Sequence, residues 1–153
     1  MKLLNVINFE KTGLSGSDVV NYHVLDGPLE QTLKFSYVNL DNPPSNINYP
    51  KEPDVIFDTA ICKNLIITYP LKNTAIFSIR GNSRNELIKE IVEAYHKIYD
   101  IEEQSSTAIA RSMGFNTANN VPGLFGIWGH SLRDLVLHRI SIYKSCILLG
   151  IDS

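Results

Sequence analysis

The sequence predicts an α+β fold, in which a mostly antiparallel sheet carries one long amphipathic helix and one or two shorter helices on one face. Three observations predict this class. The first half of the chain has β-branched and aromatic residues that alternate with polar ones, a helical period takes over near residue 83, and alternation returns after residue 139. Strands, then helices, then strands are typical of an α+β order and not of repeating β-α-β units.

Length and composition predict a single globular domain over residues 1–153. A chain of 153 residues buries about 68–70% of the surface that it exposes when unfolded. Apolar residues make up 44% of the chain and charged residues 20%, as is typical of folded proteins. The net charge of −2, from 14 basic and 16 acidic residues, argues against strong binding to nucleic acid or to anionic membranes, which needs concentrated positive charge.

The cysteines and the amino-terminal residues favour a soluble, cytoplasmic protein. Cys62 and Cys146 have neither C-x-x-C nor metal-finger spacing, so we expect two buried, reduced thiols. Asn5 and Asn8 interrupt the apolar residues near the amino terminus, which therefore make a poor signal peptide. No apolar run is long enough to span a bilayer.

Two strands and a loop are expected before residue 55. Residues 18–27 are rich in Val and Tyr, and residues 32–40 alternate apolar with polar side chains, which suggests two antiparallel strands. Residues 41–54 hold four of the seven prolines, so they cannot form a regular ladder and are expected to be a surface loop. A loop of this length either carries function or is a plain solvent-exposed connection.

A hairpin and the long helix follow. Residues 64–69 and 74–80 are rich in β-branched and aromatic residues and flank a four-residue turn. The helix is expected over residues 83–103, where Ser83 and Glu86 have the spacing of a capping box. We expect the acids at its end, Glu102 and Glu103, to be solvated charges.

The remaining elements are shorter. Residues 105–114 are expected to form a short helix that Gly114 stops, and residues 131–139 a second one, with a capping box from Ser131 to Asp134. Residues 140–153 are expected to form two short strands with a turn or bulge between them near Lys144 and Ser145, and the last strand is expected to return to the sheet.

A candidate functional or structural corner lies in the stretch GLFGIWGHSLRDLVLH, residues 123–138, and consists of Trp128, Gly129, His130, Asp134 and His138. The last three stand four residues apart and would share one face of a continuous helix, where adjacent members could bind one metal ion. They span about 12 Å of helix axis, too far for one ion to reach all three, and a fourth ligand is not evident. We therefore favour a capping role for Asp134 and local hydrogen bonds for the histidines, and expect no metal, cofactor or catalytic set.

Glycines in the same stretch resemble a phosphate-binding loop only superficially. They are evenly spaced, lack the lysine of a P-loop and follow a loop and not a parallel strand. A hinge is the better interpretation, with the neighbouring apolar side chains inserted into the core. The three glycines are Gly123, Gly126 and Gly129, and the apolar residues are Phe125, Ile127 and Trp128.

Arg80 and Arg84 flank the first turn of the long helix, where free N–H groups and the helix dipole favour anions. They are candidates for an anion contact. The alternative, which we favour, is that both are ordinary surface charges.

The segments GIWGHSLRDLVLHRISIY and LLGIDS resemble the carboxy-terminal signature of an uncharacterised protein group of large DNA viruses of protists. In that group an I-W-G-H segment leads into a D-L-x-L helix and a last strand. The resemblance covers roughly residues 65–153 and rests on Trp128, Gly129, His130, Asp134 and Leu135. It implies a viral origin and no particular chemistry. It also implies an acidic residue where this chain has His138, which weakens a metal site there.

Three functions are considered from the sequence. The leading one is a non-enzymatic intracellular protein, viral by resemblance, that binds itself or a host factor and is either packaged in the particle or acts in the infected cell. Aromatic residues at expected loops support it, since such residues anchor interfaces when exposed. They are Tyr49, Phe115, Phe125 and Trp128.

The two alternatives belong to other classes. One is a metal-dependent, hydrolase-like enzyme that uses His130 and Asp134, with or without His138. The other is a weak nucleic-acid binder, which would require the fold to gather scattered arginines on one surface. Those arginines are Arg80, Arg84, Arg111, Arg133 and Arg139.

Overall fold

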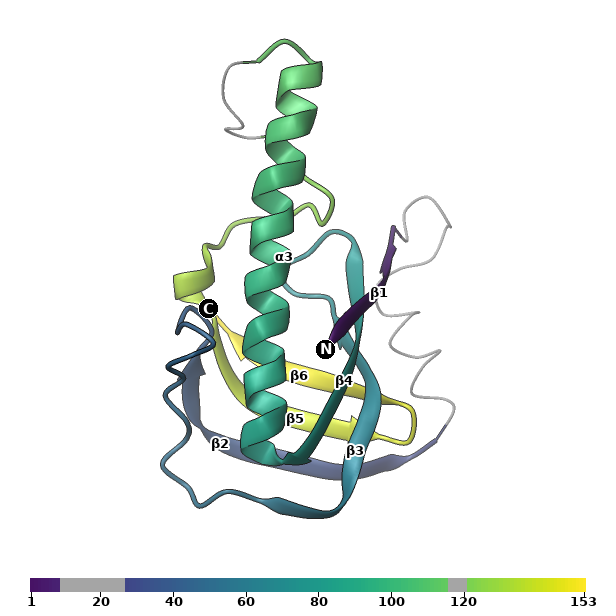
Figure 1. The fold of residues 1–153 in the computed structure, drawn as a ribbon, viewed down its shortest axis with the longest axis vertical. Coiled ribbons are helices and arrows are strands. Elements are labelled where there is room, and N and C mark those ends of the chain that lie inside the picture. Colours follow the sequence, from purple (N-terminus) through teal and green to yellow (C-terminus); the bar gives the residue numbers. More distant parts are fainter. Residues whose placement is uncertain (9–26, 116–120) are drawn as a thin grey trace.

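A long helix crosses a strongly curved sheet in the computed structural model, which describes residues 1–8, 27–115 and 121–153 (Figure 1). The α+β class with a mostly antiparallel sheet is confirmed. The elements in chain order are β1 (Lys2–Ile7), β2 (Leu29–Asn39), β3 (Ile56–Ile67), β4 (Thr74–Ser83), α3 (Arg84–Ser112), the 3₁₀ turn η1 (Leu132–Asp134), β5 (Val136–Tyr143) and β6 (Cys146–Asp152).

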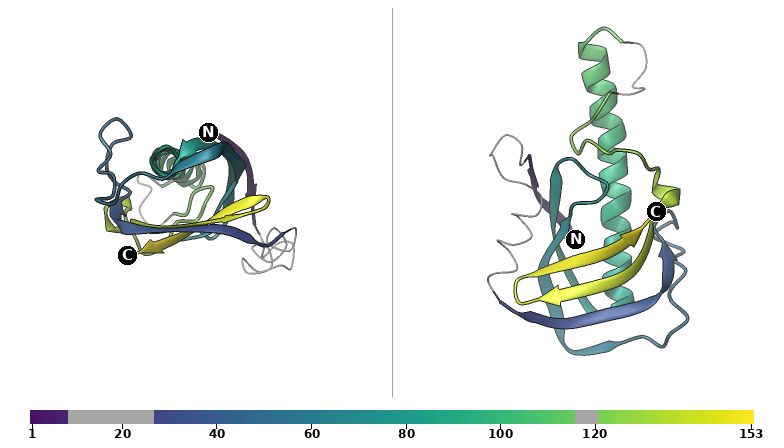
Figure 2. Two further views of the ribbon diagram at one scale, coloured as in Figure 1. Left: turned by 90° about the horizontal axis from the view of Figure 1, so that it is seen from below. Right: turned by 180° about the vertical axis from the view of Figure 1, so that it is seen from behind.

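The six described strands form one sheet in the order β1-β4-β3-β6-β5-β2. All neighbours are antiparallel except β3 and β6, which pair in parallel. Figure 2 shows the sheet curling around one side of α3, whose carboxy-terminal turns extend beyond it. The last strand therefore returns to the sheet as expected, and does so in its interior.

The predicted hairpin is confirmed as β3 and β4, with Leu65 opposite Phe77 and Ile67 opposite Ala75. All four side chains are buried and belong to the core that lies between the sheet and α3. Alternation predicts this arrangement because every second side chain on a strand points to the same face.

Helix α3 begins as predicted and ends later. Ser83 Oγ accepts a hydrogen bond from Glu86 N at 3.1 Å, which is the N-cap half of the predicted capping box. The Glu86 side chain accepts its bond from Asn82 N, one residue before the N-cap, and not from Ser83 N. The separate helix expected at residues 105–114 is wrong, because α3 runs unbroken to Ser112 before the chain turns at Gly114, whose φ is +83°. No proline or glycine interrupts residues 101–112, so nothing stops the helix earlier.

The helix expected at residues 131–139 is also wrong. Ser131 N and Oγ both donate to the Asp134 carboxylate, at 3.0 and 2.9 Å, but they close only the single turn η1. From Val136 the chain is a strand that pairs with β2 on one edge and β6 on the other. This pairing buries Leu137 and Ile140, and it outweighs the local preference for a helix.

Strand β2 occupies most of the range predicted from residues 32–40, but its partner is β5. The other early strand, expected at residues 18–27, lies outside the described residues except for Gly27. Strand β1 was not predicted. The turn expected near Lys144 is confirmed, since it joins β5 to β6.

The proline-rich segment, residues 41–54, contains no helix or strand, as predicted. It is fastened at both ends: His96 Nε2 is 2.9 Å from Asn42 O, and Ser36 N and Oγ each donate to Glu52 at 3.0 Å. Hydrogen bonds from its own backbone N–H and from Ser36 hold the pKa of the Glu52 carboxyl below its ordinary value of 4.5.

Two further features bear on the expected cellular environment. Cys146 is buried as expected, whereas Cys62 is exposed, and neither is in a disulfide. Within residues 1–8, 27–115 and 121–153, no helix combines the length and apolar character needed to cross a membrane.

Candidate functional site

The glycine-rich stretch wraps around the carboxylate of Glu102, which projects from α3. Backbone N–H groups of four residues donate to it: Gly123 at 3.1 Å, Phe125 at 2.9 Å, Gly126 at 3.3 Å and Ile127 at 2.9 Å. The expectation that Glu102 is a solvated charge is therefore wrong. The stretch binds an anion after all, but the anion is a side chain of the same protein.

A second contact fixes this loop to the turn after β3. Trp128 N donates to Pro70 O at 3.1 Å, and Lys72 N donates to Phe125 O at 3.0 Å. The loop buries Phe125 completely but leaves Trp128 53% exposed. The predicted insertion into the core is thus correct for Phe125 and wrong for Trp128.

Three rings meet at this point, and we call Tyr69, Trp128 and His130 the aromatic corner. The Tyr69 and Trp128 ring centroids are 5.5 Å apart with an edge-to-face angle of 87°. His130 lies 5.7 Å from Tyr69 and 6.0 Å from Trp128. At these separations the rings pack against one another and leave no space for a guest between them. The exposed part of Trp128 faces solvent.

Two tyrosines of α3, the buried Tyr95 and the half-buried Tyr99, donate hydrogen bonds to the backbone of the aromatic corner. Tyr95 Oη donates to Tyr69 O at 2.8 Å, and Tyr99 Oη donates to His130 O at 3.0 Å. Burial raises the pKa of both hydroxyls far above 10. Both therefore stay protonated at neutral pH and act as hydrogen-bond donors.

The remaining members of the predicted corner are not gathered with these rings. Asp134 is exposed and bonded to Ser131, whose hydroxyl and N–H lower its pKa. His138 lies on β5, with Nε2 3.4 Å from Asp152 Oδ1 and its ring 5.7 Å from that of Tyr37. The helical face that would align them does not exist because this segment is a strand.

Metal-ligating side chains show no grouping of three or more in the part of the chain that the structure describes. His130 has Tyr69, Trp128 and Ser153 as neighbours, its Nε2 lying 3.5 Å from Ser153 Oγ. Gly129 has a φ of +73° and nothing within 4 Å of where a Cβ would be, so it serves the turn and not a close contact.

The two arginines at the start of α3 have different environments. Arg84 is 2% exposed, and its guanidinium donates to Glu52 O at 3.0 Å and Pro53 O at 3.2 Å. The N–H groups of Arg84 and Asn85 also have protein acceptors, Val55 O and the Asp54 carboxylate. The expectation of an ordinary surface charge is therefore wrong for Arg84, which is buried and bonded to the proline-rich loop. Arg80 is exposed on β4, as expected.

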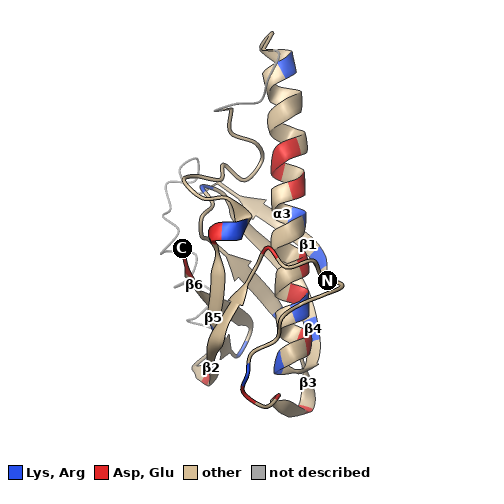
Figure 3. Ribbon diagram, turned by 90° about the vertical axis from the view of Figure 1, so that its left-hand side faces the viewer, with Lys and Arg blue, Asp and Glu red and all other residues tan. Residues whose placement is uncertain are grey.

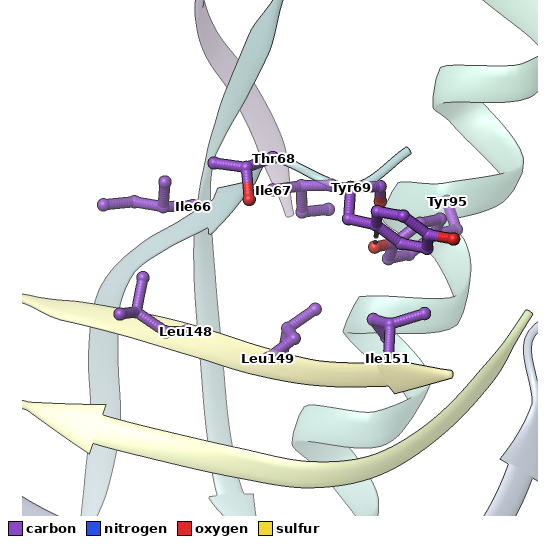
Figure 4. Close-up of a pocket in the computed structure, with 8 residues that line it drawn as sticks. All are labelled: Ile66, Ile67, Thr68, Tyr69, Tyr95, Leu148, Leu149 and Ile151. Carbon is purple, nitrogen blue, oxygen red and sulfur yellow. Dashed lines mark hydrogen bonds between the residues drawn. The ribbon is translucent and has the colours of Figure 1, made fainter. Parts of the chain in front are cut away.

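A cavity of about 220 Å³ opens between β3 and β6, next to the aromatic corner (Figure 4). Tyr69 belongs to both features. Sequence reasoning missed this residue because it follows a plain β-strand pattern, and only the fold brings it to Trp128. The lining residues are Ile66, Ile67, Thr68, Tyr69, Tyr95, Leu148, Leu149 and Ile151.

The charged residues show no face of a single sign along α3, where basic and acidic positions are interspersed (Figure 3). Among the arginines named above, Arg84 is buried and the others are exposed on separate elements.

No protein-family model, no curated protein and no solved structure matches the chain. Its function is therefore inferred from its own residues.

Proposed function

We propose that this chain is a non-enzymatic protein-interaction protein that binds through the aromatic corner. The observation that carries the proposal is the position of Trp128. The residue is 53% exposed, although its backbone is hydrogen-bonded to Pro70 O and its ring is packed edge to face on Tyr69.

An exposed but immobilised tryptophan is what an interface anchor requires. Tryptophan and tyrosine are enriched among the residues that contribute most to binding, because they offer a large contact area with few rotatable bonds. Holding the ring in place before binding lowers the entropy that association costs. The Glu102 carboxylate supports this by fixing the loop at Ile127 N, one residue before the tryptophan.

The alternatives find less support in the geometry. The His130 ring contacts two other rings and lies 3.5 Å from a hydroxyl, and Tyr99 donates to its backbone carbonyl. Asp134, the partner that a hydrolase would use with it, is bonded to Ser131. The arginines that nucleic-acid binding would use lie on separate elements, and one of them is buried.

The resemblance of the carboxy-terminal segments to a group of large DNA viruses of protists extends the proposal. On that basis the partner is a second copy of the chain or a host factor, met in the cytoplasm of the infected cell or in the particle.

Paired aromatic substitutions test the proposal. Tyr37, 66% exposed on β2, is the control because its ring contacts His138 and not the aromatic corner. We expect Trp128→Ala to weaken self-association, or recovery of a partner from infected cells, at least thirtyfold, which corresponds to a hot spot of about 2 kcal/mol. Tyr37→Ala should change it less than threefold.

Light scattering over a concentration series measures self-association, and quantitative affinity capture measures a partner. Equal recovery by the two variants, with both folded by circular dichroism, would remove the aromatic corner as the binding surface.

A further inference from the structure

The seam between β3 and β6 is very short. The parallel pairing comprises only Asn64 with Cys146 and Leu65 with Ile147. Beyond these pairs the two strands separate, and the cavity occupies the space between them. Figure 4 shows Ile66, Thr68 and Tyr69 along one side of it and the β6 residues along the other.

Backbone hydrogen-bonding groups of both strands face this cavity. Asn64 N donates across the seam to Ser145 O at 3.3 Å. In this parallel pattern the pair of Leu65 with Ile147 uses the Ile66 N–H, so the next groups toward the gap are the Ile66 C=O on β3 and the Leu149 N–H on β6. The pairing stops before it joins these two groups, since no pair of Ile66 with Leu148 follows.

The side chains of the cavity are uncharged. Six of the eight lining residues are isoleucine, leucine or threonine. The two tyrosine hydroxyls have partners, since Tyr95 Oη donates to Tyr69 O and Tyr69 Oη lies 2.8 Å from Ser153 Oγ. An occupant with a net charge would lose its hydration without gaining an ion pair, so the complementary group is apolar.

The volume of the cavity limits the size of an apolar occupant. Small-molecule sites usually measure about 300–1,000 Å³, and this cavity measures about 220 Å³. It holds one or two aliphatic side chains but not a larger ligand. A side chain presented by an extended backbone uses both the apolar space and the backbone groups at its rim.

We propose that the gap between β3 and β6 binds an extended, uncharged segment of a partner polypeptide, which adds as a short strand and inserts an aliphatic side chain into the cavity. This inference rests on the proposed function and specifies the partner. Tyr69 makes the two surfaces continuous, because it lines the cavity and its ring contacts Trp128.

The protein contains its own reporter, since Trp128 is the single tryptophan of the chain and lies 5.5 Å from Tyr69. The probe is the blocked peptide acetyl-Lys-Thr-Val-Leu-Val-Thr-Lys-amide, titrated while tryptophan emission is recorded. We expect saturable binding. Replacing its central leucine by aspartate, or methylating the nitrogen of that leucine, should weaken binding at least tenfold.

Substitutions at Thr68 locate the site. Thr68→Phe fills the cavity and should weaken binding of the leucine peptide at least tenfold, whereas Thr68→Val keeps the volume and should change it less than twofold. Ile151→Phe fills the same space from β6 and replaces Thr68→Phe if that variant does not fold.

Three results would overturn the inference: no saturable binding of the leucine peptide, equal binding of the N-methylated peptide, or unchanged binding by a folded cavity-filled variant. The proposed function is judged separately. If Trp128→Ala loses the partner but Thr68→Phe keeps it, only the strand-addition inference fails.

Discussion

Glu102 offers the sharpest test of how the aromatic corner is built. Its carboxylate accepts four backbone hydrogen bonds from the loop that carries Trp128, and the shortest, from Phe125 N and Ile127 N, are both 2.9 Å. Glu102→Ala removes this acceptor and leaves the loop attached to α3 through the Ser105 hydroxyl, which accepts from Leu124 N at 2.8 Å.

The expected magnitude follows from those two short bonds. A hydrogen bond to a charged group contributes about 1.5–3 kcal/mol, so two contribute roughly 3–6 kcal/mol if nothing replaces them. Glu102 is only partly buried, and water will replace part of the loss. We therefore expect Glu102→Ala to lower the free energy of unfolding by about 2–4 kcal/mol and Tm by roughly 4–16 °C.

The assay is urea unfolding followed by circular dichroism, together with the emission of Trp128. Glu102→Gln should lower the free energy of unfolding less than Glu102→Ala does, because the amide keeps one acceptor oxygen. It should still destabilise the protein, because the amide NH2 is a donor that faces the N–H groups of the loop. Glu103→Ala is the matched control, since the adjacent residue is exposed and should change stability by no more than about 0.5 kcal/mol. Equal stability and equal emission for Glu102→Ala and Glu103→Ala would refute the reasoning.

Three further predictions concern the loops and the candidate histidine. Gly126→Ala should lower the free energy of unfolding by at least about 2 kcal/mol, because its φ is +62° and the new Cβ would lie 2.8 Å from Lys72 Cβ. Gly129→Ala has a similar φ but open space around the new Cβ, so it should lower the free energy of unfolding by only about 1 kcal/mol. Urea unfolding measures both. Glu52 stabilises the fold above its ordinary pKa of 4.5, and this contribution should be lost as pH falls through its lowered folded-state pKa. Glu52→Gln should therefore flatten the dependence of Tm on pH between 6 and 3, and an unchanged slope would contradict the assignment. EDTA should leave Tm unchanged, and elemental analysis should find no stoichiometric metal; a bound ion lost on His130→Ala or Asp134→Ala would revive the metal hypothesis.

The β3/β4 hairpin and the start of α3 were predictable because their signals are local. Alternation over residues 64–80 and the N-cap at Ser83 involve neighbours within a few positions, and the structure reproduces both. The end of α3 was less predictable. The serines at 105 and 106 favour a new helix start by sequence, but inside α3 their hydroxyls bond back to the carbonyls of Ile101 and Glu103.

The segment after Ser131 shows where local signals mislead. Its capping box is real, but one turn satisfies it, and the next residues are extended. Two sheet neighbours decide the outcome, β2 from about 100 residues earlier and β6 from the following residues. No local sequence pattern indicates the pairing with β2.

The aromatic corner also depends on contacts between residues that are far apart in the sequence. Trp128 and His130 were singled out by composition, whereas Tyr69 and Glu102 were not, since their partners lie more than 20 residues away. The expected alignment of His130, Asp134 and His138 failed together with the helix that would have produced it.

The order of the strands also sets how this chain must fold. β3 and β4 can pair early because they are neighbours in the sequence. Among the described strands β2 pairs only with β5, about 100 residues later, so most of the chain must be ordered before this pair can form. Non-local closure of this kind slows the search for the native state and leaves strand edges uncovered meanwhile. Refolding is therefore expected to take milliseconds to seconds and to lose yield by aggregation as protein concentration rises.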